Sequence, residues 1–332
     1  MRTAENALVP PFQRPHSQVA IRRAASYEED LFKLIHETLT EFQSHARSTQ
    51  ASTNRAAAHG GLKMSDLRGK VVLLKPNFVG LDPLGAVNSH PAVVAATRES
   101  FLKLGAAQVL IGEGPALDRD TEGIIESVRL REHAGNLMRT FVDLNLDEVE
   151  RVPLKTRASR LKELYLPKTA LGADIVVSMP MLKTHHWAGV TLSLKNMFGV
   201  VPGGCYGWPK NVLHWAGIDN SILDINAALR PDFAIVDGIW GMEGNGPIQG
   251  VPKKAGVLIL GNDPVAVDAT CCRIMGLIPE RIKYLTGAGT LLGHLKQERI
   301  EQLGEPIADV RTPFALLKEF NKLAEPGREK WN

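Results

Sequence analysis

The sequence predicts a three-layer α/β fold, in which a largely parallel sheet carries helices on both faces and a helical extension precedes it. From residue 64 onward, short runs of β-branched residues and leucines alternate with helical stretches. The runs are continuously apolar, as in strands buried on both faces, and alternating strands and helices form such layers. With 332 residues, 44% of them hydrophobic, the chain can form one large domain or two smaller ones.

The first 63 residues are predicted to form an arm, a helix and a linker. Residues 1–25 carry three prolines and little pattern, which indicates an arm. Residues 27–46 place apolar side chains at helical spacing, which predicts an amphipathic helix. Residues 47–63 are small and polar, with the pair Gly60-Gly61 as a helix breaker, which is typical of a linker.

Residues 64–300 are predicted to form the α/β core that holds the site. Its apolar runs predict strands at 71–74, 109–111, 141–142, 175–177, 233–236 and 257–260. Helices are expected over 91–104, 121–133 and 264–276, and a hairpin over 151–166. The last segment, 301–332, is expected to hold a final amphipathic helix at 313–323 and a tail.

Composition argues against several classes of protein. The net charge is only +3, and no basic stripe is interleaved with aromatic residues, so no nucleic-acid partner is expected. No apolar run approaches the roughly 18 residues of a membrane span, so no membrane partner is expected either. Three cysteines form no disulfide framework and cannot supply the four thiolates usual for an iron–sulfur cluster. We expect a cytoplasmic protein and leave a homo-oligomer open.

Polar residues follow the predicted strands, beside Gly and Pro. If the strands are parallel, their carboxyl ends share one edge, where ligands bind in such sheets. We therefore expect one cleft, lined by Lys75, Asn77, Lys183, His185, Lys195, Asp237 and Asp263. The alternative is that loops after strands are polar in any protein, and that Asp263-Pro264 is a plain helix N-cap followed by proline.

The segment 183–214 carries the densest chemistry. Lys183 and His185 are two residues apart, so in an extended backbone they face the same way. Lys195, Asn196 and His214 follow. Lysines and an asparagine near a histidine would hold a carboxylate or phosphate while the imidazole moves a proton. The alternative interpretation has solvated lysines and histidines bonded to backbone carbonyls.

A glycine-rich loop and several carboxylates complete the candidate set. Five glycines in the thirteen positions 238–250 would let the backbone amides of Gly244 and Gly246 approach an anion. Asp237 and Glu243 would hold a second proton or a metal, and Asp263 and Asp268 offer hard oxygen ligands for a divalent cation. The fingerprints GxGxxG and GxxxxGK[ST] are absent, so neither a Rossmann dinucleotide site nor a P-loop is marked.

Over residues 70–295 the sequence resembles the family called domain of unknown function 362 (DUF362). The matching stretches are Lys75-Pro76-Asn77, His90-Pro91, Pro180-Met181-Leu182-Lys183-Thr184-His185, Leu194-Lys195-Asn196-Met197-Phe198-Gly199, His214, Asp237-Gly238, Met242-Glu243-Gly244-Asn245-Gly246-Pro247 and Asp263-Pro264-Val265-Ala266-Val267-Asp268. Many relatives carry an iron–sulfur module with clustered cysteines, which three scattered cysteines here cannot build. The resemblance implies a fold and a site, and no particular reaction.

Together these features predict an enzyme that acts on a small anionic metabolite by acid–base proton transfer, of the epimerase, isomerase or lyase type. The expected catalytic residues are His185, Lys183, Asp237 and Glu243. The expected substrate-binding residues are Lys75, Asn77, Lys195, Asn196, His214, Gly244 and Gly246, with Asp263 and Asp268 as metal ligands. A metal-dependent hydrolase or transferase, and a non-catalytic protein that binds a ligand or cofactor, remain open.

Overall fold

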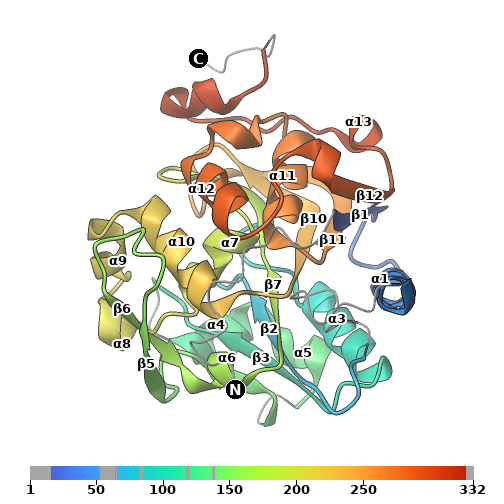
Figure 1. The fold of residues 1–332 in the computed structure, drawn as a ribbon, viewed down its shortest axis with the longest axis horizontal. Coiled ribbons are helices and arrows are strands. Elements are labelled where there is room, and N and C mark those ends of the chain that lie inside the picture. Colours follow the sequence, from blue (N-terminus) through green and yellow to red (C-terminus); the bar gives the residue numbers. More distant parts are fainter. Residues whose placement is uncertain are drawn as a thin grey trace.

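The computed structural model describes residues 16–52, 64, 66–82, 85–116, 120–136 and 139–326. Its described residues form a large mixed sheet between two layers of helices, which confirms the predicted fold class (Figure 1). Across the sheet, the strands follow the order β12 (Ile300–Gly304), β1 (Ser17–Arg23), β11 (Val251–Gly261), β10 (Phe233–Glu243), β7 (Ile175–Met179), β2 (Val71–Pro76), β3 (Gln108–Glu113) and β4 (Phe141–Asp143).

Five neighbouring strands form the parallel half of the sheet. Strands β10, β7, β2, β3 and β4 all run in the same direction. All but β4 are buried over most of their length, which explains why their sequences are continuous apolar runs. Their carboxyl ends meet at one edge, and this edge carries the candidate site.

The other half of the sheet departs from the prediction. Strand β11 runs antiparallel to both β10 and β1, so its carboxyl end lies at the opposite edge. Strand β1 lies between β11 and β12, within the segment that was predicted to be an unpatterned arm. The sheet therefore crosses both of the limits predicted between segments 1–63, 64–300 and 301–332.

Alternate residues of each strand pack into different helical layers. Side chains of Leu74 and Ile235 join the cluster of α1 (Leu31–Ser52), α3 (Pro91–Lys103), α4 (Thr121–Ser127) and α5 (Leu130–Ala134). Side chains of Leu73 and Val236 join the cluster of α7 (Ser193–Asn196), α10 (Ile218–Leu229), α11 (Pro264–Ile274) and α12 (Lys283–Leu291). Figure 1 shows α1 and α3 on one side and α10 and α12 on the other.

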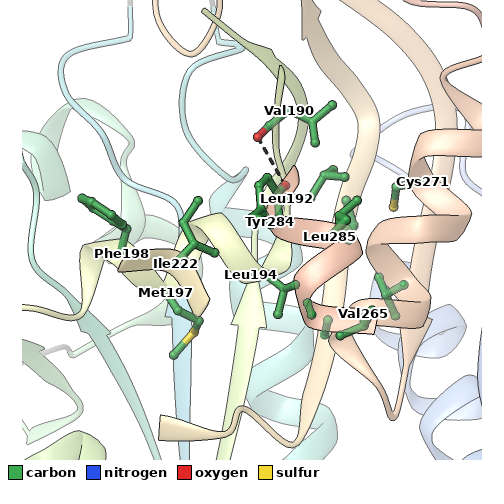
Figure 2. Close-up of a cluster of buried hydrophobic side chains, with 14 of the residues drawn as sticks. Val190, Leu192, Leu194, Met197, Phe198, Ile222, Val265, Cys271, Tyr284 and Leu285 are labelled. Atoms are coloured by element: carbon green, nitrogen blue, oxygen red, sulfur yellow. Dashed lines mark hydrogen bonds between the residues drawn. The ribbon is translucent and has the colours of Figure 1, made fainter. Parts of the chain in front are cut away.

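A small hairpin extends the sheet at the edge with the site. Strand β8 (Met181–His185) pairs with the second half of β10, and it turns back into β9 (Gly189–Thr191). Figure 2 shows how the chain after β9 is held: Leu192 and Leu194 lie among apolar side chains of α11 and α12, and the Tyr284 hydroxyl donates to the Val190 carbonyl. Lys183 and His185 therefore lie on a hairpin that is packed along one side.

The remaining elements are a hairpin and several short helices. The hairpin expected over 151–166 is confirmed as β5 (Val149–Pro153) and β6 (Glu163–Pro167). Short helices connect the larger elements: α6 (Lys168–Gly172), α8 (Gly203–Tyr206), α9 (Asn211–Trp215) and α13 (Ile307–Val310). None of the helices in the described residues is long and apolar enough to cross a membrane.

The predicted C-terminal helix at 313–323 does not form. Residues 312–317 have no regular secondary structure, and only a 3-10 helix, η7 (Lys318–Leu323), follows them. The backbone amides of Thr312, Phe314 and Ala315 donate to the Ile274 carbonyl, the Met275 carbonyl and the Glu243 carboxylate. These bonds hold the segment against the end of α11 and the Glu243 carboxylate, and only the short η7 follows it.

Candidate active site

A buried ion pair anchors the site at the carboxyl ends of β2 and β3. The Lys75 Nζ lies 2.7 and 2.8 Å from the two carboxylate oxygens of Glu113. It also donates to the Pro76 carbonyl at 2.6 Å and to Asn196 Oδ1 at 3.2 Å. Burial lowers the pKa of Lys75, and the charge of Glu113 opposes this shift. Because an ammonium has three donors, these partners leave Lys75 no donor for a ligand.

The two asparagines differ in whether their side chains have a hydrogen-bonding group without a partner. Asn196 donates from Nδ2 to the Lys75 carbonyl at 2.9 Å and to Ser178 Oγ at 3.1 Å, so its amide holds the framework. Asn77 donates its backbone N–H to Ser89 Oγ at 3.0 Å. Its buried side-chain Oδ1 has no hydrogen-bond partner among the described residues. Asn77 therefore retains an acceptor, as a substrate-binding role requires.

Lys183 carries an ammonium group into the interior with only one hydrogen bond. Its side chain is fully buried, and among the described residues Nζ donates only to the Val87 carbonyl, at 2.7 Å. Loss of hydration lowers the pKa of Lys183 to about 7; the charge of Asp82 opposes this, and the charge of Lys195 adds to it. Two donors of Lys183 are thus free to bind an anion.

Lys195 is even less well satisfied. It lies on α7, partly exposed, with Nζ 4.1 Å from the centroid of the Phe198 ring. Within the described part of the chain, no carboxylate or hydrogen-bond acceptor contacts this ammonium. Loss of hydration and the charge of Lys75 lower the pKa of Lys195 to about 7. Cation–π contact with Phe198 is its one favourable electrostatic interaction there.

A fourth lysine and the anchoring carboxylate were missed by the sequence analysis as site residues. Lys210 is buried and donates to the Gly114 carbonyl at 2.7 Å and the Gly199 carbonyl at 2.9 Å, joining the loops after β3 and α7. Nothing in its sequence context marks this role. Glu113 lies two residues after a predicted strand, between two glycines, and that position was a usable signal.

Three histidines lie beside the lysines. His185 accepts at Nδ1 from the backbone N–H groups of Trp187 and Ala188, and burial lowers its pKa well below the usual value. His214 bonds through Nδ1 to the Lys210 carbonyl at 3.0 Å, and burial lowers its pKa to about 4. Both rings are therefore neutral at pH 7. His186 bonds through Nδ1 to the Gly246 carbonyl at 2.9 Å.

An exposed tryptophan links the histidines at the tip of the hairpin. The Trp187 ring lies 4.9 Å from the ring of His186 and 5.1 Å from the ring of His214, and the side chain is 58% exposed. Lys195 lowers the pKa of both His185 and His214, which places all three in one electrostatic environment.

Comparison with known proteins identifies the family. The family described as domain of unknown function (DUF362) matches residues 72–273. The chain belongs to the DUF362 family. A thylakoid-associated protein of Synechocystis sp. is 32% identical over 233 residues, which are 67% of this chain and 68% of that protein.

Among solved structures, the lactate racemase apoprotein from Thermoanaerobacterium thermosaccharolyticum is similar at 15% identity, with a TM-score of 0.40. The match covers 65% of this chain and 50% of that one, so this chain spans about half the length of the racemase.

Asp237, a DUF362-matching residue, lies on the face of β10 that α1 and α3 cover. It shares its face of β10 with Ile235 and Ile239, which pack in the cluster of α1 and α3. Its carboxylate accepts from the Tyr27 hydroxyl at 3.1 Å and from the backbone N–H of His90 at 3.0 Å. Burial raises the pKa of Asp237 to about 7. The segment 87–90 that donates to Asp237 at His90 also accepts the hydrogen bond of Lys183 Nζ, at the Val87 carbonyl.

The loop at 243–246 supports the hairpin from outside. The Glu243 carboxylate accepts from the Ala315 amide at 2.9 Å and lies 3.4 Å from Lys253 Nζ. The Gly244 amide donates to the Ala315 carbonyl, so it is not free to bind an anion as predicted. The Gly246 carbonyl accepts from the backbone N–H of His186. A Cβ at Gly246 would lie 2.1 Å from the Thr184 carbonyl oxygen, so the close approach requires glycine.

The two aspartates predicted to bind a metal serve as helix caps. Asp263 lies at the opposite edge of the sheet because β11 is antiparallel, and it accepts from Ser17 Oγ at 2.6 Å and Val265 N at 2.9 Å. Asp268 accepts from the backbone N–H groups of Ser193 and Leu194. Across the described ranges, no three His, Cys, Asp or Glu side chains are grouped to hold a metal ion. The predicted metal ligation by this pair is corrected accordingly.

Proposed function

We propose that the carboxyl edge of the parallel strands is an active site that binds a small carboxylate or phosphate and transfers a proton on it. One observation carries the proposal: Lys183 is fully buried and Lys195 is partly exposed, and both have spare donors with no carboxylate in contact among the described residues. Unpaired buried charge is costly, and a bound anion would remove that cost.

The neighbouring histidines supply the acid–base chemistry. A neutral imidazole can accept a proton at its lone-pair nitrogen and can return that proton once it is charged. Two ammonium groups on a carboxylate would also stabilise the negative charge that develops when a proton leaves the adjacent carbon. Racemisation, epimerisation and elimination all begin with that step. A metal-dependent hydrolase is less well supported, because Asp263 lies at the opposite edge of the sheet and caps helix α11.

The binding test replaces each lysine with methionine, which keeps most of the aliphatic stem. Loss of one charge-assisted hydrogen bond costs about 1.5–3 kcal/mol, so affinity should fall by roughly one to two orders of magnitude in Lys183→Met and Lys195→Met. Thermal shifts across phosphates, sugar acids and hydroxy acids measure this. The exposed Lys296, changed to Met, is the matched control. A ligand that stabilises all four proteins equally would refute the anion-binding role.

Catalysis is tested separately from binding. A ligand found in this way is incubated in deuterium oxide with wild-type protein, and NMR follows its carbon-bound hydrogens. Proton transfer predicts deuterium incorporation that the lysine variants lose. Tight binding without exchange at any carbon or change in the ligand would favour the non-catalytic alternative.

We also propose that the protein works in the cytoplasm. The three cysteines are free, and Cys205 is exposed, as is usual in a reducing compartment. The similar Synechocystis protein is called thylakoid-associated, so fractionation of source cells should follow both the membrane and the supernatant. Recovery with membranes after a high-salt wash would overturn this placement.

A further inference from the structure

The ring of His185 is held by two backbone amides in the turn after β8. Trp187 N–H donates to Nδ1 at 2.9 Å, and Ala188 N–H donates to the same atom at 3.2 Å. An atom that accepts hydrogen bonds carries no proton, so the proton of the neutral ring is on Nε2. The side chain is only 6% exposed, and none of the described residues accepts from Nε2. His185 thus has one fixed N–H donor without a partner.

The ring of His214 is held in the opposite way. Its Nδ1 lies 3.0 Å from the Lys210 carbonyl oxygen, which can only accept, so Nδ1 carries the proton. The neutral ring then has its lone pair on Nε2, and no described residue donates to that atom. Lys210 is itself fixed by the Gly114 and Gly199 carbonyls, so the carbonyl that orients His214 belongs to an anchored residue.

We infer that His185 and His214 are fixed in opposite neutral tautomers, so that the site offers a bound anion one N–H donor and one lone pair. His185 is then unable to take a proton at Nε2, and it acts as a hydrogen-bond donor to an oxygen. His214 is the group that can accept a proton. The sequence does not indicate whether His185 acts as acid or base. The backbone N–H groups of Trp187 and Ala188 decide it, because they occupy the lone pair of Nδ1.

This arrangement selects a class of substrate, an inference that rests on the proposed function. A hydroxyl that is next to the anionic group and lies between the two Nε2 atoms matches both histidines, because its oxygen can accept from His185 and its hydrogen can donate to His214. A keto oxygen satisfies His185 alone and turns a lone pair toward the lone pair of His214. A methylene group satisfies neither. The preferred ligand is therefore a hydroxy acid, with its carboxylate on Lys183 and Lys195.

The tautomers are tested without any ligand or activity. Protein labelled with nitrogen-15 in histidine is examined at pH 7.5 by long-range proton–nitrogen correlation, which distinguishes protonated from lone-pair ring nitrogens. His185→Gln and His214→Gln assign the signals by their loss. The expected result is a lone pair on Nδ1 of His185 and on Nε2 of His214. The same tautomer in both rings, or a charged ring in either, would overturn the inference.

The substrate class is tested with three acids of matched shape: 2-hydroxybutyrate, butyrate and 2-oxobutyrate. Wild-type protein should bind the hydroxy acid about three- to tenfold more tightly than either of the others, the effect of one or two net hydrogen bonds. His185→Phe and His214→Phe keep an aromatic ring and should lose this preference while still binding butyrate. A preference that survives in both variants would overturn the assignment. Failure of all three acids and of the phosphates to bind, with the tautomers as expected, would refute the proposed function instead.

Discussion

At the scale of single residues, the four lysines of the site divide by what surrounds the ammonium group. Lys75 and Lys210 are saturated by acceptors from the protein, and they hold loops together. Lys183 and Lys195 are not, and their pKa values fall to about 7 for lack of hydration. The same residue type thus serves as framework in two positions and as a candidate ligand-binding group in the other two.

Lys183 should make the stability of the protein depend on pH. Between pH 7.5 and 9.5 it is largely neutral in the folded state, whose pKa is about 7, and protonated in the unfolded state, near 10.5. The unfolded state then binds more protons, so this lysine raises the free energy of unfolding by about 1.4 kcal/mol per pH unit as pH increases. The free energy of unfolding, measured with urea at several pH values, should rise with pH more steeply by that amount in wild type than in Lys183→Met. Lys296→Met should show the wild-type dependence. Parallel slopes for Lys183→Met and wild type would contradict the shift.

At this scale the sequence predicts which polar residues lie at the site, but it does not predict which of their hydrogen-bond donors the protein itself occupies. Lys183 and His185 were predicted because polar groups follow a buried strand, and Lys195 and His214 because they lie in the segment 183–214, which is dense in such groups. The sequence cannot predict which lysines have their donors occupied, because the acceptors are carbonyl groups of distant loops, such as that of Gly114 for Lys210.

At the scale of elements, the short helix α7 is capped from another helix. No side chain before Ser193 caps it; instead Asp268 of α11 accepts from the Ser193 hydroxyl and from the backbone N–H groups of Ser193 and Leu194. Helix α7 carries both Lys195 and Asn196. The position of the site thus depends on a carboxylate that itself lies outside it.

Asp268→Ala should therefore affect both stability and binding. Loss of these charge-assisted bonds leaves buried amides unpaired, and we expect destabilisation of about 2–4 kcal/mol, together with a weaker thermal shift by anions. Thr270→Val on the same helix is the control, since the Thr270 hydroxyl bonds only within the helix. If the alanine variant does not fold, Asp268→Asn gives the milder test. Unchanged stability and binding in both would show that α7 is held by packing alone.

Strands were predicted correctly where burial on both faces gives a continuous apolar run. They were not predicted where the position or direction of a strand depends on the strands that pair with it. The parallel strands read as apolar runs because both of their faces are covered. Strand β1 has only a short apolar core between polar residues, and its neighbours come from the other end of the chain. The direction of β11 leaves no mark in its composition, which is why Asp263 was placed at the wrong edge.

At the scale of the whole molecule, the sheet joins the N-terminal part of the chain to its last strand. In β1, Val19, Ala20 and Ile21 are fully buried, and the strand separates β11 from β12. Removal of residues 1–25 should abolish cooperative thermal unfolding or cause aggregation, because it exposes the edge of β11. Removal of residues 1–15 leaves β1 intact and should preserve the transition. Equal melting temperatures for the two truncations would show that β1 is dispensable.

The setting of the lysine cluster within a nearly neutral molecule has a consequence for how fast a ligand arrives and leaves. The chain has 39 basic and 36 acidic side chains, so its charges largely cancel at a distance. Salt at physiological strength screens what remains beyond about 8 Å. A ligand is therefore not steered from afar, and its association rate should change little with ionic strength. The attraction acts only after entry, so the strength of the site should appear as slow departure of the ligand.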